Sequence, residues 1–114
     1  MFRFEKETTM TELKGTILVD FDRTLALYRG TDHRTIGPPI KLMVERVRRW
    51  LNDGYTIRIF TARAASTSPN REEDIRLIGD WSQEHIGRRL EVTAEKGFDA
   101  VMIVDDLAAA VVQN

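Results

Sequence analysis

Hydrophobic and polar residues follow two different spacings along the chain. Four short, nearly continuous apolar runs are typical of strands that are covered on both faces of a parallel sheet. These runs are Thr16–Asp20, Tyr55–Phe60, Leu90–Thr93 and Val101–Val104. Arg58 interrupts the second run, so we expect one face of that strand to be partly open.

Two longer segments have the spacing of amphipathic helices. The first opens at Pro38-Pro39 and runs to Leu51, and the second covers Arg71–Ile86 after a small, polar loop at Ala62–Asn70. The resulting order is strand, helix, strand, helix, strand, strand. This order predicts an α/β fold, in which a mainly parallel central sheet is flanked by helices in a Rossmann-like arrangement.

The length of 114 residues fits a single domain over 1–114. Residues 1–14 are mixed in character and are either an edge strand or a loose tail. Residues 23–37 have no period and are expected to be irregular. Val111-Val112 is expected to form a brief fifth strand.

Composition narrows the classes of function. The formal net charge is −1, which does not favour a dedicated nucleic-acid binder, because such proteins usually have a basic excess. There is no cysteine, which excludes disulfides and thiolate zinc sites. No apolar run approaches the about 20 residues of a membrane-spanning helix. We therefore expect a cytoplasmic protein with no membrane partner.

Several acidic and hydroxyl residues stand at the ends of the predicted strands. Right-handed crossovers place the carboxyl ends of parallel strands at one edge of the sheet, where ligands bind. The residues expected there are Asp20, Asp22, Thr61 and the pair Asp105-Asp106. Carboxylates that converge need a compensating charge, and hard oxygen ligands favour Mg²⁺. Lys96, just before the fourth strand, would add a fixed positive charge.

Each of these residues also has a plain structural interpretation. An aspartate after a strand often only caps a turn, and Asp106 would cap one through Leu107–Ala110. Thr61 alone is an ordinary strand-end hydroxyl, and Lys96 alone is a solvated lysine. We expect Arg63 to be a surface arginine, with a contact to substrate phosphate as the alternative. The functional interpretation depends on the joint pattern.

The joint pattern resembles the haloacid dehalogenase superfamily of phosphohydrolases, and in particular its small bacterial and phage members. The family signature has four parts in chain order: Asp-x-Asp-x-Thr after strand one, Thr or Ser ending strand two, Lys before strand four, and an acidic pair ending strand four. They are matched here by Asp20-Phe21-Asp22-Arg23-Thr24, Thr61, Lys96 and Asp105-Asp106. The resemblance extends from Thr16 to about Val112.

The resemblance implies a Mg²⁺-dependent phosphatase that hydrolyses a phosphomonoester through an aspartyl-phosphate. Asp20 would be the nucleophile and Asp22 the general acid and base. Mg²⁺ would be held by the side chains of Asp20 and Asp105 and the backbone carbonyl of Asp22, with Asp106 in support. Thr61 and Lys96 would bind the phosphoryl oxygens. The substrate would be a small phosphorylated metabolite or a nucleotide.

The chain departs from the family pattern in two places. Arg23 stands where a Gly or another small or apolar residue is usual, and it would reach the phosphate, narrow the site or repel Mg²⁺. Leu107 stands where close relatives often have Arg. The family's usual cap has no counterpart, because 23–37 is too short for one and forms a flap instead. The site is therefore expected to be open.

Two alternative functions remain beside the metabolite phosphatase. An open site would also suit a phosphatase for nucleotides or nucleic-acid ends, with weak support from the basic helix face of Arg46, Arg48 and Arg49. A different class is a non-catalytic phosphate-binding or signalling domain, including a pseudoenzyme disabled by Arg23.

Overall fold

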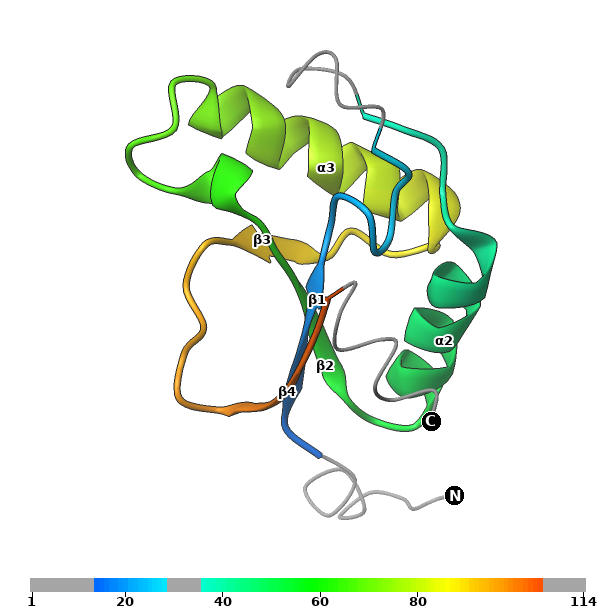
Figure 1. The fold of residues 1–114 in the computed structure, drawn as a ribbon. Helices are drawn as coiled ribbons and strands as arrows, with labels where there is room; N and C mark the ends of the chain where they lie inside the picture. The colour runs from blue at the N-terminus through cyan, green and yellow to red at the C-terminus, as the bar shows by residue number, and fades with distance from the viewer. Residues whose placement is uncertain (1–13, 29–35, 106–114) are drawn as a thin grey trace.

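The computed structural model describes residues 14–28 and 36–105, and in this part the chain forms one α/β layer structure (Figure 1). All strand pairs in the sheet are parallel, and the strand order is β3-β2-β1-β4. The elements in chain order are β1 (Thr16–Asp20), α2 (Lys41–Asn52), β2 (Thr56–Phe60), the short 3₁₀ helix η1 (Ala62–Ala64), α3 (Arg71–His85), β3 (Glu91–Thr93) and β4 (Ala100–Val104).

The predicted Rossmann-like fold and the predicted strands and helices are confirmed, with boundaries that shift by one residue at several ends. The first helix begins at Lys41, after Ile40 as its N-cap, so Pro38 and Pro39 precede the helix instead of opening it. Leu90 lies outside β3 because its N–H donates to the Ser82 hydroxyl at 2.9 Å, away from the neighbouring strand. The loop expected at Ala62–Asn70 contains η1. The predictions for residues 1–13, the fifth strand at Val111-Val112, the middle of the flap and Asp106 lie outside the described residues.

The hydrophobic core lies between one face of the sheet and both helices. Alternate residues of each strand point to this face, and they include Ile17 and Val19 in β1, which are completely buried. Helix α2 adds Met43, Val44 and Val47, and α3 adds Ile78 and Trp81 to the same cluster. Both helices therefore cover the same face. None of the described helices has the length and apolar character needed to cross a membrane.

The opposite face of the sheet carries the connection from β3 to β4. Asp99 accepts a hydrogen bond of 2.6 Å from the Thr16 hydroxyl and one of 3.0 Å from Arg58 Nη2. Arg58 also pairs with Glu91 at 3.2 Å. The side chain of Arg58 is 21% exposed, which confirms the partly open face predicted for β2. These polar contacts hold the connection against the start of β1 and the middle of β2.

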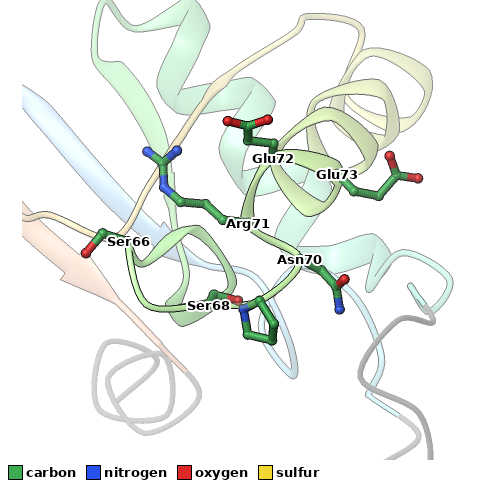
Figure 2. A pocket seen from close by; sticks show the side chains of 7 residues that line it. Ser66, Ser68, Asn70, Arg71, Glu72 and Glu73 are labelled. Atoms are coloured by element: carbon green, nitrogen blue, oxygen red, sulfur yellow. The ribbon is translucent and has the colours of Figure 1, made fainter.

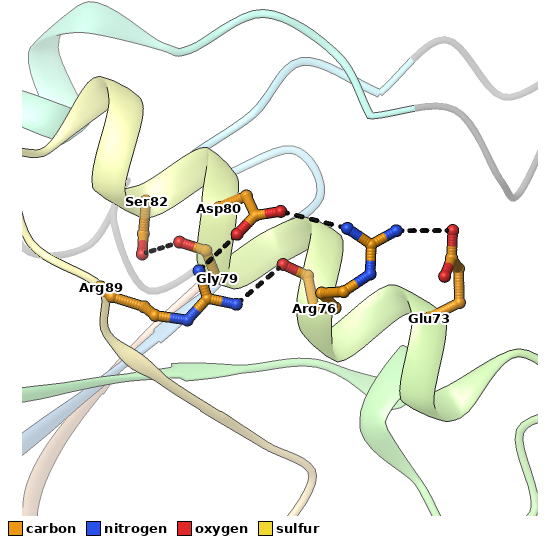
Figure 3. A network of polar contacts seen from close by, with 6 residues as sticks. All are labelled: Glu73, Arg76, Gly79, Asp80, Ser82 and Arg89. Atoms are coloured by element: carbon orange, nitrogen blue, oxygen red, sulfur yellow. Dashed lines mark hydrogen bonds and ion pairs between the residues drawn. The ribbon is translucent and has the colours of Figure 1, made fainter.

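The end of α3 is tied to the chain that enters β3 (Figure 3). The Ser82 hydroxyl is completely buried, donates to the Gly79 carbonyl at 2.8 Å and accepts from Leu90 N–H. Arg89 pairs with Asp80 and donates to the Arg76 carbonyl at 3.2 Å. A hydrogen bond from Arg89 is the main cause that lowers the pKa of Asp80 below its usual value. This network fixes the direction in which the chain leaves α3 and enters β3.

Candidate active site

Two aspartates leave the sheet together at the point where the strand order reverses. The chain passes from β1 outward to β2 and β3 and then returns to β4 on the other side of β1. Val19 and Val104 are register partners in the β1–β4 pair. Asp20 and Asp105, which come next on each strand, therefore lie at the carboxyl edge beside this switch point. Both side chains are partly buried, and this is where parallel α/β sheets bind ligands.

Phe21, between the two aspartates of the first motif, anchors the segment in the core. It is completely buried and meets Trp81 edge to face, with ring centroids 5.0 Å apart. Successive side chains of an extended segment point to opposite sides. Because Phe21 points into the core, Asp20 and Asp22 lie on the other side and keep partial exposure. The spacing of the motif thus places two carboxylates on the ligand side.

A tight turn follows Asp22. The carbonyl of Phe21 accepts hydrogen bonds from the N–H groups of Leu25 at 2.9 Å and Ala26 at 3.0 Å. Arg23 has a φ of 73°, in the left-handed region that favours glycine. A glycine would adopt this conformation more readily than arginine does. The guanidinium of Arg23 lies 5.2 Å from the ring centroid of Tyr28, and within residues 14–28 and 36–105 it forms no ion pair with Asp20 or Asp22.

Thr61 stands at the end of β2 and begins η1. It is 4% exposed, and its N–H donates to the Thr93 carbonyl at 2.9 Å. Its hydroxyl oxygen accepts from the N–H of Arg63 at 3.2 Å. A hydroxyl that accepts one bond can still donate one, so Thr61 keeps the donor that a phosphoryl oxygen would need.

Arg63 pairs directly with Asp22. Its Nε and Nη2 each donate at 3.0 Å, to Oδ2 and Oδ1 of Asp22 respectively. The Arg63 side chain is only 10% exposed, and that of Asp22 is 25% exposed. The expectation of a surface arginine is therefore wrong. Because η1 follows Thr61 immediately, the guanidinium returns across the edge of the sheet instead of extending into solvent.

Thr24, the last residue of the first motif, is 3% exposed. Its hydroxyl is buried and has no hydrogen-bond partner within the described part of the chain. A buried hydroxyl without a partner is unusual, because its desolvation is not compensated. Thr24 follows Asp22 by two residues, so this hydroxyl is a further polar group near the candidate site.

Lys96 lies on the β3–β4 connection and is exposed. The next residue, Gly97, lies close to the end of the Arg58 side chain, where an added Cβ would lie 3.1 Å from Nη1. Over the described ranges, no ion pair joins Lys96 to Asp20, Asp22 or Asp105. The structure therefore brings Asp20, Asp22, Thr61, Arg63 and Asp105 to one edge, and it leaves Lys96 on the loop.

Carboxylate and carbonyl oxygens, which are the kind of ligand that Mg²⁺ takes, come together at this edge. The described residues contain no group of three or more His, Cys, Asp or Glu side chains placed to hold a metal. The set implied by the resemblance needs only two of these side chains, from Asp20 and Asp105, together with the backbone carbonyl of Asp22. Mg²⁺ prefers oxygen ligands and usually keeps several waters, so a set with few protein ligands suits it.

An open, polar pocket of about 500 Å³ lies beside η1 (Figure 2). Its lining comes from the preceding loop and the first turn of α3: Ser66, Ser68, Pro69, Asn70, Arg71, Glu72 and Glu73. Arg71 Nε donates to the Ala64 carbonyl at 2.9 Å, which ties the pocket wall to η1. Glu72 and Glu73 bring two negative charges to this lining, which disfavours the binding of a phosphate there.

One arginine of the basic face of α2, Arg48, stabilises the fold. Arg48 donates to the carbonyl of Ile86 at 3.2 Å and to that of His85 at 2.7 Å. These bonds cap the last carbonyls of α3 and join the two helices. This use of Arg48 weakens the argument that the face binds nucleic acid.

The Arg63–Asp22 pair is the feature that sequence reasoning missed. The sequence offered one indication of this pair, which is that Arg63 follows Thr61 by two residues. At this spacing the Arg63 side chain reaches Asp22 only if a short helical turn follows β2. That turn has no strong sequence signature, since Ala62–Ala64 is short and the following residues are small and polar. The contact between Arg63 and Asp22 therefore depends on the backbone conformation of η1.

Comparisons with known proteins bear on the fold. No protein-family model matches the chain, and no curated protein matches it. A solved structure, described as a conserved protein from Bacteroides thetaiotaomicron, is similar with a TM-score of 0.58 and 20% sequence identity. The match covers 81% of this chain and 75% of that chain. This similarity supports the Rossmann-like α/β fold.

Proposed function

We propose that the protein is a Mg²⁺-dependent phosphatase that acts on a phosphomonoester and belongs to the haloacid dehalogenase superfamily. One observation carries the proposal. The register partners Val19 and Val104 deliver Asp20 and Asp105 side by side at the switch point of a parallel sheet. Asp22 and Thr61 reach the same edge from the adjacent turn and strand.

The proposed reaction has two displacements at phosphorus. A carboxylate oxygen of Asp20 attacks, the bond from phosphorus to the ester oxygen breaks, and Asp22 gives its proton to the leaving alcohol. Water then attacks the phosphoryl group on Asp20 and loses a proton to Asp22. The bond from phosphorus to Asp20 breaks, which frees phosphate and restores both carboxyl groups.

The other residues of the edge would bind and orient the phosphoryl group. Thr61 would donate its hydroxyl to a phosphoryl oxygen, and Arg63 offers a guanidinium fork within the same edge. Asp20, Asp105 and the Asp22 carbonyl would hold Mg²⁺, which neutralises charge on the phosphoryl oxygens when it is bound. Lys96 would have to move from its exposed position on the β3–β4 connection to reach a phosphoryl group at this edge. Small phosphorylated metabolites and nucleotides are the proposed substrates.

Hydrolysis of a generic aryl phosphate tests the proposal. Wild-type protein is expected to release the aryl alcohol with Mg²⁺ and to lose this activity with a chelator. Asp20→Asn keeps the size of the side chain and removes the nucleophile, so its turnover should fall at least about a hundredfold. The matched variant Asp53→Asn, on an exposed residue after α2, should keep full turnover. Equal turnover by wild type and Asp20→Asn would contradict the proposal.

A second candidate function is phosphate binding without turnover. The Arg63–Asp22 pair favours it, because both carboxylate oxygens of the proposed acid and base are already engaged. The exposed position of Lys96 favours it too. Binding of inorganic phosphate with Mg²⁺, in a protein that hydrolyses no member of a panel of phosphorylated metabolites and nucleotides, would support this second function.

A further inference from the structure

The backbone of Arg63 is held in place, whereas its side chain is long enough to contact more than one acceptor. The N–H of Arg63 is bonded to the Thr61 hydroxyl at 3.2 Å, and the end of η1 is held by Arg71 at the Ala64 carbonyl. The backbone of Arg63 is therefore anchored beside the proposed phosphate ligand. Its side chain crosses from there to Asp22.

The bond pattern at Asp22 is one that a phosphoryl group can replace. Arg63 donates two bonds of 3.0 Å to two oxygens of the Asp22 carboxylate. A phosphate group offers the same pair of acceptors to a guanidinium fork. It also carries more negative charge than a carboxylate, about two charges for a monoester near neutral pH. A phosphomonoester at Thr61 would therefore compete with Asp22 for Arg63.

We propose that Arg63 is a positioning residue that exchanges partners during binding. In the empty site it holds Asp22, and when a phosphomonoester binds, its fork moves to the phosphoryl oxygens. The exchange frees the oxygens of Asp22, one of which then takes up a proton from water and faces the leaving group as the general acid. This inference rests on the proposed function, since it requires phosphate to bind at the edge formed by Asp20 and Thr61.

The exchange also selects a substrate class. A phosphomonoester has three terminal oxygens, so the guanidinium fork can take two of them and Mg²⁺ the third, while Thr61 donates to a second lone pair on one of the three. A phosphodiester has two terminal oxygens and a single negative charge, so it draws Arg63 from Asp22 less strongly. Monoesters are thus bound with Arg63 on the phosphate, and diesters leave the Arg63–Asp22 pair in place.

A double-mutant cycle tests the exchange through binding alone. The affinity for inorganic phosphate with Mg²⁺ is measured by calorimetry for wild type, Asp22→Asn, Arg63→Gln and the double variant. If Arg63 must leave Asp22, then Asp22→Asn tightens binding at least about threefold more with Arg63 present than in the Arg63→Gln background. Arg76→Gln, which removes an exposed arginine of α3, should leave the affinity unchanged.

The sign of the coupling between the two substitutions distinguishes an Arg63 that exchanges partners from one that stays paired with Asp22. If Arg63 stays on Asp22 and only screens its charge, Asp22→Asn will have the larger effect in the Arg63→Gln background. That result, or equal effects in the two backgrounds, would overturn the exchange.

The wild-type chain provides a second test that needs no variant at Asp22. The ¹⁵N–¹H signal of Arg63 Nε, assigned with Arg63→Lys, should shift when inorganic phosphate and Mg²⁺ are added, together with the amide of Thr61. Dimethyl phosphate should leave the Nε signal in place. A shift of Thr61 without Arg63 would overturn the exchange and leave the phosphate site intact. A shift of neither would overturn both proposals, and an equal response to the diester would overturn the substrate selection.

Discussion

Val104 of β4 is the register partner of Val19 of β1, and an aspartate follows each of them. Asp20 and Asp105 therefore emerge from adjacent parallel strands, and a divalent cation bound between them would relieve the repulsion of their carboxylates. We predict that Mg²⁺ at ten times its dissociation constant raises the free energy of unfolding by about 1.4 kcal/mol. Asp105→Asn should lose most of this gain in urea unfolding with and without Mg²⁺.

Glu95→Gln is the matched control for the magnesium prediction. It removes the same charge from an exposed residue on the β3–β4 connection, so it should keep the full response to Mg²⁺. The same response in Asp105→Asn and Glu95→Gln would mean that Mg²⁺ does not bind between the two strand ends.

Arg23 is strained by its positive φ of 73°. We predict that Arg23→Gly is more stable than Arg23→Ala by about 1 kcal/mol, because only glycine adopts this conformation without a Cβ penalty. Both variants lose the contact with Tyr28 equally, so the difference between their stabilities reports the cost of the backbone conformation alone. The measurement is the urea midpoint of each variant, and equal midpoints would show that the turn relaxes around residue 23.

Gly37 is required by the close approach of two backbone segments at the base of the flap. A Cβ at Gly37 would lie 1.9 Å from the Leu27 carbonyl oxygen. The Gly37 carbonyl also accepts from Trp81 Nε1 at 3.1 Å, so the segment cannot move away freely. We predict that Gly37→Ala lowers the free energy of unfolding by about 2–3 kcal/mol.

Gly87→Ala is the control for the close approach at Gly37. Its φ of 98° makes a side chain strained, but an added Cβ meets open space. It should cost about 1 kcal/mol from the backbone alone. If Gly37→Ala costs no more than Gly87→Ala in thermal unfolding, the contact between Gly37 and Leu27 is not rigid.

Asp99 makes stability depend on acid pH. The hydrogen bond from the Thr16 hydroxyl is the first cause that lowers its pKa below the usual 3.8, and Arg58 adds to it. A lowered pKa stabilises the fold above pH 3.8, and this contribution is lost as the pH falls through the folded pKa. The urea midpoints of wild type and Asp99→Asn should therefore converge as the pH falls below 3.8.

Thr16→Val gives the Asp99 prediction its control. It keeps the shape of the buried side chain and removes the hydroxyl donor, so the pKa of Asp99 should move toward its usual value. The acid loss of stability should then be smaller than in wild type. A difference between wild type and Asp99→Asn that is constant over this pH range would show that the carboxylate is not stabilised by the fold.

The sequence predicted the fold well because apolar runs and helical spacing are local signals. The strand Thr16–Asp20 and the start of α3 at Arg71 agree with their predicted positions. The site depends on side chains that meet across 41 residues, as Arg63 and Asp22 do, and no local pattern encodes that contact. The position of Lys96 depended on how the β3–β4 connection is held by Thr16, Arg58 and Asp99, which spacing alone does not specify.

Trapping the phosphoryl group on its acceptor tests the central claim most directly. The protein is quenched during turnover of an aryl phosphate with Mg²⁺ and reduced with borohydride, which converts an aspartyl-phosphate to homoserine. Peptide mass spectrometry then locates the reduced residue. We predict homoserine at position 20, and none in Asp20→Asn. Reduction at Asp22 or Asp105, or turnover without any reduced aspartate, would contradict the assignment of Asp20 as the nucleophile.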